Sequence, residues 1–349
     1  MARMSWTTGP RDAITDVPGI RVGHWTDRRA ATGCTAVLCE GATTAAVDVR
    51  GGAPGTRETE VLAQANLVRL CHAIVLSGGS AFGLASATGV MRWLAEHDTG
   101  FATTVRKVPI VPAAVLFDLG LGKADAFPGE AEGYLAAKRA RGGAVEQGSV
   151  GAGAGATVAK MLGKEHCLKG GLGSASVAGP RGLVVGAVVA NNASGQVVDP
   201  DTARVVAGPR ARRRGFVSLP EAMNLRTARM DALVENTTLV CVATNAALDH
   251  HQAQRLAIQA HDGIGRAIMP AHTFGDGDIA FALAMGKLPI KPDDMFALGL
   301  MTVRAVERAL VKSVLLATGL HGVPSAGEWL AGPAAAQSSR PGHENTTLA

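Results

Sequence analysis

Aromatic and charged residues are scarce in this sequence. Phe, Trp and Tyr together make up 4% of the 349 residues, with a single tyrosine, and charged residues make up 18%. Hydrophobic residues nevertheless reach 47%, and glycine, usually about 7% of a protein, occupies 44 positions. The chain therefore has enough apolar material for a large globular core, which we expect to be built from small, closely packed residues rather than from aromatic rings.

Other features that are missing exclude whole classes of function. No apolar run approaches the ~20 residues that a membrane span needs, and the N-terminus lacks the apolar core of a signal peptide, so we expect a cytoplasmic protein without a membrane partner. The net charge of +5 is modest, and the basic cluster Arg210 and 212–214 lies between Pro and Gly residues without interleaved aromatics. This cluster is typical of a solvated loop, so no nucleic-acid partner is expected.

Cysteine and histidine also lack the spacing of a redox or metal site. The five cysteines include no Cys-x-x-Cys pair and fall mostly in apolar runs, which predicts free, buried thiols. His250, His251 and His261 fall in one predicted helix, but their spacing matches no metal motif, and we expect solvated helix positions. We therefore expect no metal and no cofactor.

The predicted elements begin with a meander of strands and end with long helices. Because strands come first and helices are then inserted between further strands, the order suits two sheets packed between helical layers, an α/β fold. The predicted strands are Ile14–Trp25, Cys34–Glu40, Ala45–Arg50, Ala73–Leu76, Val108–Leu119, Leu168–Val177 and Leu183–Ala190. One predicted helix follows the loop Arg50–Thr59 and ends at about His72. The other predicted helices are Leu84–His97, Glu130–Arg141, Asp249–Ile268 and Asp293–Leu316.

One stretch combines a buried strand with a nucleophile at its first residue. From Thr238 the sequence is β-branched and apolar, which predicts a strand of a covered sheet, and Thr237 stands at its start after Asn236. The Thr237 hydroxyl can attack the Asn236 carbonyl, shift the acyl group from nitrogen to oxygen, and leave a new N-terminus after hydrolysis. The freed α-amine, with a pKa of roughly 7.7–8.0, can then serve as the base for the same hydroxyl.

An Asn-Thr step alone more often merely begins a strand. The sequence contains its own example, because 344–348 repeats the five residues Glu-Asn-Thr-Thr-Leu with only one residue after them. No strand can present a threonine there. The surroundings of Thr237 must therefore support the catalytic interpretation.

Three other segments carry candidate site residues. Gly148–Lys160 is rich in Gly and Ala, and we expect a tightly packed segment that brings Lys160 near a site rather than a linker. His272–Leu283 predicts a strand, an acidic turn and a strand, in which a hairpin at Asp276-Gly277 explains one aspartate but not Asp278. The loop Arg50–Thr59 is either a tight turn with a helix N-cap or the wall of a polar pocket.

These features together resemble one family. In order, the matching segments are Ile14–His24, Arg50–Thr59, Leu76–Gly83 and Asn236–Asn245, followed by the acidic turn. They resemble the DmpA-type peptidases, self-cleaving N-terminal-nucleophile aminopeptidases that include β-peptidyl aminopeptidases and the nylon-oligomer hydrolase. The resemblance extends from about Ile14 to Leu320.

The resemblance implies an αββα sandwich of the DmpA/ornithine-acetyltransferase type. One catalytic domain would cover 1–331, with a disordered tail at 332–349, and self-cleavage after Asn236 would yield chains 1–236 and 237–349. The family also implies a homo-oligomer, a tetramer of such cleaved heterodimers. Its substrates are small peptides or amides.

The resemblance also implies roles for individual residues. Thr237 falls on the nucleophile of the family and Asn191 on its oxyanion-binding asparagine. Asp276 and Asp278 fall on the acidic pair of the nylon hydrolase, and Lys160 on its active-site lysine. A carboxylate would orient the Thr237 ammonium, and a nearby lysine would lower the pKa of that amine.

Some departures leave the activity open. Where relatives have a tyrosine in Val-Ile-Tyr-Asp, this chain has Phe117 before Asp118, and its nucleophile is threonine instead of the serine of the aminopeptidase prototypes. We expect an amidohydrolase that acts on peptides or ω-amino amides. The alternatives are an acyltransferase of the ornithine-acetyltransferase type, although its Ala-Thr-Met-Leu signature is absent, and an uncleaved, non-catalytic homologue.

Overall fold

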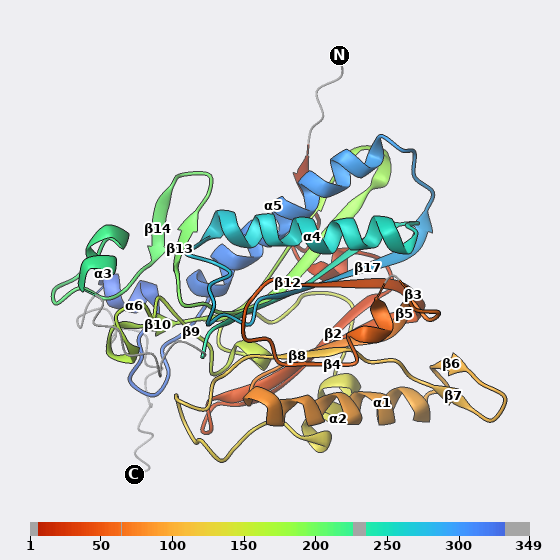
Figure 1. The fold of residues 1–349 in the computed structure, drawn as a ribbon, viewed down its shortest axis with the longest axis horizontal. Helices are drawn as coiled ribbons and strands as arrows, with labels where there is room; N and C mark the ends of the chain where they lie inside the picture. The colour runs from red at the N-terminus through yellow and green to blue at the C-terminus, as the bar shows by residue number, and fades with distance from the viewer. Residues whose placement is uncertain (1–5, 64, 226–234, 332–349) are drawn as a thin grey trace, which may run out of the picture.

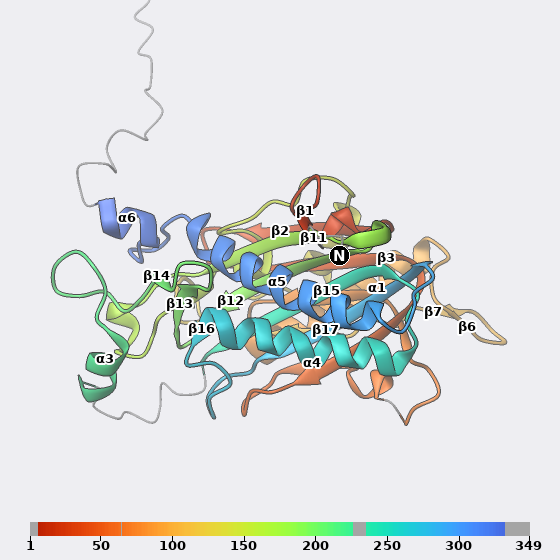
Figure 2. The same ribbon diagram turned by 90° about the horizontal axis from the view of Figure 1, so that it is seen from above.

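The chain folds into four layers, helices on either side of two sheet layers, as expected (Figure 1). The computed structural model describes residues 6–63, 65–225 and 235–331. One sheet layer is covered by α4 (His250–Ala267) and α5 (Asp294–Leu315), which lie side by side across it (Figure 2). The other is covered by α1 (Ser86–Glu96) and α2 (Glu130–Lys138).

A single long strand, β3 (Thr32–Val49), joins the two sheet layers. Its first half pairs with β2 (Ile20–Asp27) and β5 (Leu70–Ser77), and its second half pairs with β17 (Ile279–Leu288). The hydrogen-bonded order is therefore continuous, β1-β11-β12-β15-β17-β3-β5-β8-β4. The remaining strands of this order are β1 (Thr7–Thr8), β4 (Thr56–Arg57), β8 (Ala113–Val115), β11 (Gly171–Ala178), β12 (Val184–Asn192) and β15 (Thr237–Ala246).

The alternation of side chains along the strands separates three apolar cores. On β15, Val240 and Val242 belong to the core beneath α4 and α5, whereas Leu239 and Cys241 belong to the core between the two sheet layers. A third core lies between β5 and α1 and includes Val75. Successive strand residues point to opposite faces, and a core covers each face of β15. Every residue of β15 is therefore buried, which explains its continuous apolar sequence.

Small residues allow these layers to approach closely. A Cβ on Gly89 of α1 would lie 1.8 Å from the Glu130 carbonyl oxygen, and one on Gly133 of α2 would lie 1.8 Å from the Ser86 carbonyl oxygen. The two helices therefore touch backbone to backbone, which only glycine permits. The expectation of a core built from small residues is confirmed.

Short elements complete the described chain. Residues 191–225 contain β13 (Gln196–Asp199), β14 (Arg204–Ala207) and α3 (Leu219–Leu225), and residues 226–234 lie outside the described residues. The proposed tail 332–349, with its second Glu-Asn-Thr-Thr-Leu, also lies outside them. Other short elements are β6 (Phe101–Ala102), β7 (Lys107–Val108), β9 (Thr157–Val158), β10 (Leu168–Lys169), β16 (Ile268–Met269) and α6 (Ala326–Ala331).

Several local predictions are confirmed. Helices α4 and α5 lie where they were predicted, and Asp249 caps α4 by accepting a hydrogen bond from the Gln252 N–H at 2.8 Å. All five cysteines are free and buried. In the described part of the chain, no helix has both the length and the apolar character to cross a bilayer.

Other local predictions are wrong. The helix predicted up to His72 is replaced by a short turn and β5, because a strand buried on both faces has the same apolar composition as a buried helix segment. Strands predicted at 34–40 and 45–50 form one bent strand, β3, with a register shift after Leu38. His250 and His261 are buried instead of solvated, and their Nε2 atoms lie 2.8 and 3.0 Å from backbone carbonyl oxygens.

Candidate active site

Strand β15 presents Thr237 at its first residue, as the sequence predicts. Thr237 pairs with Asn192 of β12 and is only 5% exposed. Since paired residues share a face, the Thr237 and Asn192 side chains both lie on the face between the sheet layers. The neighbouring pair, Asn191 and Thr238, lies on the opposite face, toward the helices.

The carbonyl of Asn236 receives two hydrogen bonds. The Thr237 hydroxyl donates to its oxygen at 2.5 Å, and the Gly277 backbone N–H donates at 2.8 Å. A Cβ on Gly277 would lie 2.9 Å from Thr237 Oγ1, so glycine keeps this approach open. The hydroxyl is thus held against the carbonyl that it was predicted to attack, and a fixed N–H donor is aimed at the oxygen where negative charge would develop.

The acidic turn supports the same strand end, although it is not the predicted hairpin. β17 runs parallel to β15, and α4 forms the crossover between them. Asp278 Oδ1 accepts a hydrogen bond from the Thr238 N–H at 2.6 Å. Its Oδ2 accepts from the His272 backbone N–H at 3.0 Å and lies 2.8 Å from His272 Nδ1. The carboxylate of Asp278 therefore binds the backbone N–H of the residue that follows Thr237.

Asp276 is held by the turn itself. Its Oδ2 accepts hydrogen bonds from the Thr273 N–H at 2.8 Å and from the Thr273 hydroxyl at 2.5 Å. Burial, and then the charge of Asp278, raise the pKa of the Asp276 carboxyl. The two aspartates thus have different hydrogen-bond partners, Thr273 for Asp276 and the Thr238 N–H with His272 for Asp278.

The Arg50–Thr59 loop holds the acidic turn through its backbone. The Arg50 N–H donates to the Asp278 carbonyl at 3.0 Å, and the Ala53 N–H donates to the Asp276 carbonyl at 2.9 Å. The side chain of Thr59 makes no N-cap hydrogen bond to the short helix that follows. The arginines contact other groups, such as Thr88 from Arg57 at 2.6 Å. The loop therefore packs against the acidic turn through backbone hydrogen bonds, and its Thr59 side chain does not cap a helix.

Lys160 lies at the carbonyl before Asn236. Its Nζ donates to the Asn192 carbonyl at 2.8 Å and to the Glu235 carbonyl at 3.1 Å. Burial lowers the pKa of Lys160 to about 7, against the opposing charges of neighbours such as Asp276. An amine with a pKa in this range exchanges protons at neutral pH. The Gly- and Ala-rich segment brings Lys160 to the strand end, as expected.

The asparagine expected at the site is displaced by one residue. The Asn191 side chain donates to Ser313 of α5 at 3.1 Å and is turned away from Thr237. Asn192 Nδ2 donates instead to the Glu235 carbonyl at 3.0 Å and to the Phe117 carbonyl at 3.1 Å. Of the two asparagines, Asn192 is therefore the one whose side chain lies on the face of Thr237.

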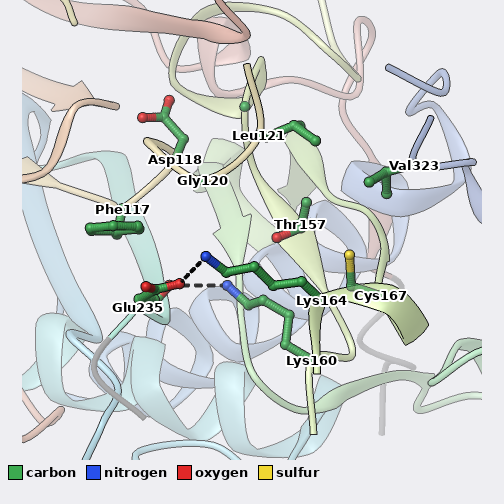
Figure 3. Close-up of a pocket in the computed structure, with 11 residues that line it drawn as sticks. Phe117, Asp118, Gly120, Leu121, Thr157, Lys160, Lys164, Cys167, Glu235 and Val323 are labelled. Carbon is green, nitrogen blue, oxygen red and sulfur yellow. Dashed lines mark hydrogen bonds and ion pairs between the residues drawn. The ribbon is translucent and has the colours of Figure 1, made fainter. Parts of the chain in front are cut away.

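A small pocket opens beside these residues (Figure 3). Its volume is about 60 Å³, room for a few water molecules. Phe117, which replaces the tyrosine of the family, lies at its wall with its ring 5.9 Å from Lys164 Nζ. Lys164 pairs with the Glu235 carboxylate at 2.8 Å. The lining residues are Phe117, Asp118, Gly120, Leu121, Gly155, Thr157, Lys160, Lys164, Cys167, Glu235 and Val323.

Sequence reasoning missed four groups at this site: Asn192, His272, Lys164 and the N–H of Gly277. Asn192 could have been found by counting alternate residues along β12, because Val188 and Ala190 precede it on the same face. The other three depend on pairing between segments far apart in the chain, for which the sequence holds no local signal.

Comparison with known sequences gives a consistent family. The model of peptidase family S58 matches residues 12–326. An uncharacterized aminopeptidase of Mycobacterium tuberculosis is 41% identical over 340 residues, covering 90% of this chain and 96% of that protein. A 6-aminohexanoate-oligomer endohydrolase of Paenarthrobacter ureafaciens is 28% identical over 317 residues, covering 89% of this chain and 85% of that protein.

Solved structures share the fold. A beta-aminopeptidase of Burkholderia sp. superposes with a TM-score of 0.68 at 24% identity, covering 92% of both chains. The L-aminopeptidase D-Ala-esterase/amidase of Ochrobactrum anthropi, described as a variant of the Ntn hydrolase fold, superposes with a TM-score of 0.69 at 23% identity, covering 91% of this chain and 90% of that one. This chain therefore shares the fold of these two structures.

Proposed function

This chain belongs to peptidase family S58, and from that membership we propose that it is an amidohydrolase whose nucleophile is Thr237. Self-cleavage after Asn236 would expose that threonine as a new N-terminus. Its substrates would be small peptides or ω-amino amides, in line with the aminopeptidase and oligomer-hydrolase names of its relatives. The single αββα domain would act in the cytoplasm as a homo-oligomer of cleaved pairs.

The contacts of the Asn236 carbonyl support the cleavage step. Thr237 Oγ1 adds to the carbonyl carbon, and the Gly277 N–H stabilises the negative oxygen that forms. The carbon–nitrogen bond then breaks, the hydroxyl proton ends on the Thr237 nitrogen, and Asn236 is left as an ester. Water hydrolyses this ester to give the Asn236 carboxylate and a free Thr237 amine.

The same residues can then turn over an external amide. The α-amine of Thr237, with a pKa near 8 in the absence of neighbours, takes the proton from its own hydroxyl. Asp278, which accepts a hydrogen bond from the N–H of the next residue, Thr238, can orient the Thr237 ammonium. When the Lys160 amine beside the strand end is charged, it favours the neutral, basic form of the Thr237 amine. An acyl-Thr237 ester forms, and water releases the acid.

The observation that carries the proposal is the Thr237 hydroxyl held at the carbonyl of Asn236 opposite a backbone N–H donor. A panel of aminoacyl p-nitroanilides, β-amino amides and aminohexanoate oligomers tests the activity. We expect short, flexible acyl groups to be hydrolysed, because small residues and few aromatics surround the site. A cleaved protein that hydrolyses none of these amides, or that prefers esters of large aromatic acids, would contradict the proposal.

The lowered pKa of Lys160 predicts a pH-dependent stability. Its pKa of about 7 in the folded chain lies below the ~10.4 of an unfolded lysine. Between these values the unfolded state binds more protons, so the free energy of unfolding rises with pH. We expect uncleaved Thr237→Ala protein to gain roughly 1 kcal/mol more between about pH 7 and 8.5 than the same chain carrying Lys160→Met. Equal gains in urea unfolding would show that Lys160 stays charged.

A further inference from the structure

Two lysines of the pocket hold one residue, Glu235, which immediately precedes Asn236. The Glu235 carboxylate lies 2.8 Å from Lys164 Nζ, and its carbonyl oxygen accepts hydrogen bonds from Lys160 Nζ at 3.1 Å and from Asn192 Nδ2 at 3.0 Å. Both lysine side chains point toward Glu235 from the same side (Figure 3). Side chain and backbone of this residue are therefore bound separately.

Glu235 and Asn236 are the acyl part of the first amide that Thr237 would cut. The groups that hold them in the uncleaved chain therefore report on the chemistry of the acyl side of the site. The Lys164 ion pair and the two hydrogen bonds to its carbonyl hold Glu235 at the pocket. Its departure would enlarge the pocket and leave Lys164 without its carboxylate.

The charges that face the emptied position are mainly positive. Lys164 and Lys160 would both face it, with the Lys160 pKa near neutrality. Asp118 also lines the pocket, but its Oδ1 accepts a hydrogen bond from the Gly79 N–H at 2.7 Å, and Thr32 and Lys169 lie near its carboxylate. Asp118 thus has partners elsewhere, and a bound carboxylate would meet the lysines first.

On the basis of the proposed self-cleavage, we propose that Lys164 and Lys160 form an acyl-side subsite for a carboxylate. The preferred substrates would be amides of short acidic peptides, in which a carboxylate side chain lies one residue before the scissile carbonyl, as Glu235 does. Lys164 Nζ would bind that carboxylate, and Lys160 Nζ with Asn192 Nδ2 would bind the carbonyl of the same residue. The subsite would determine specificity and would leave the chemistry to Thr237.

A matched set of substrates tests this subsite on the cleaved protein. Glu-Asn and Gln-Asn p-nitroanilides differ only in the charge at the position of Glu235, Lys-Asn p-nitroanilide places a positive charge there on a longer side chain, and Asn p-nitroanilide does not reach Lys164. Because the Lys164 side chain is 54% exposed, we expect a modest preference, kcat/KM about twofold to fivefold higher for Glu-Asn than for Gln-Asn. The preference should weaken with added salt.

Variants of Lys164 test whether this lysine recognises the charge of the substrate side chain at the position of Glu235. Lys164→Met keeps most of the stem and should abolish the preference for Glu-Asn over Gln-Asn, and Lys164→Glu should turn it toward Lys-Asn. Lys107→Met is the control, since Lys107 lies in the β6–β7 hairpin outside the pocket and is also paired with a carboxylate, Asp98, at 2.6 Å. The control should keep the wild-type preference.

The outcomes separate this inference from the proposed function. A cleaved enzyme that hydrolyses Asn p-nitroanilide but treats Glu-Asn and Gln-Asn alike overturns the carboxylate subsite alone. So does a preference that survives Lys164→Met. A chain that never cleaves overturns both. If the cleaved protein proves inactive on all four amides, calorimetry with acetyl-Glu-Asn and acetyl-Gln-Asn decides, and equal affinities refute the subsite.

Discussion

Thr237→Ala should leave a single chain of 35.6 kDa without amidase activity. The variant lacks the hydroxyl that lies at the Asn236 carbonyl, so the acyl group cannot shift and the α-amine is never released. An internal Thr237 has only an amide nitrogen, which is no base. We expect processing to stop and turnover to fall by at least about 10³-fold, as for loss of other catalytic nucleophiles. Gel electrophoresis and hydrolysis of Asn p-nitroanilide measure the two effects.

Two further variants control for the sequence around Thr237. Thr346→Ala alters the same five-residue motif near the C-terminus and should change neither processing nor activity, because it leaves Asn236, Thr237 and strand β15 unchanged. Thr237→Ser keeps the hydroxyl and loses only the methyl group that restricts its χ1, so it should still cleave. Normal processing of Thr237→Ala would remove Thr237 from the mechanism.

Asp278→Asn should lower turnover by about 10²-fold, in the range of losing one general acid–base or charge contribution. The asparagine can still accept the hydrogen bond from the Thr238 N–H, but it carries no charge to orient the Thr237 ammonium. Stability should fall as well, by about 1–3 kcal/mol, because Asp278 is buried and its second oxygen accepts from His272. Steady-state kinetics and urea unfolding separate the two effects, and unchanged turnover would remove Asp278 from the site.

His272 provides the matched comparison for that variant. Burial is the largest single influence and opposes the charged form, but the hydrogen bond to Asp278 and the charges of Asp278 and Asp276 together raise the pKa of His272 above its usual value. His272→Asn keeps a donor near the position of Nδ1 and tolerates the left-handed backbone, φ 55°, so it should retain most of the activity. His272→Ala lacks the donor and should lose more. If both variants lost activity equally, positioning of Asp278 by this hydrogen bond would be refuted.

The fold could be predicted where local pattern and packing agree. Helices α4 and α5 have clear apolar periodicity and keep their predicted ranges, and the run from Thr238 forms β15 as expected. The strand predicted at Ala73–Leu76 is confirmed as part of β5, but the start of β5 at Leu70 falls in the predicted helix, because a strand buried on both faces has no alternation. The bend that lets β3 serve both sheet layers depends on pairing with β5 and β17, which are distant in sequence.

The sequence predicted which segments meet at the site, but not always which residue of a segment faces it. Thr237, Asp278 and Lys160 contact the backbone of residues 235–238, as the motifs indicated: the Asn236 carbonyl, the Thr238 N–H and the Glu235 carbonyl, respectively. Asn191 was implied by the resemblance alone. The register of β12 against β15 places Asn192, and not Asn191, on the face of Thr237. A shift of one residue in the register of a strand moves each side chain to the opposite face of the sheet.

The central claim is that the chain cuts itself between Asn236 and Thr237. Intact-mass spectrometry of the freshly purified wild-type protein, with N-terminal sequencing of the smaller fragment, tests it most directly. We predict fragments of about 24 and 11.5 kDa, in proportion to residues 1–236 and 237–349 of the 35.6-kDa chain, the smaller beginning Thr-Thr-Leu-Val-Cys. A single mass of 35.6 kDa in a preparation that hydrolyses amides would contradict the account and require a nucleophile other than Thr237.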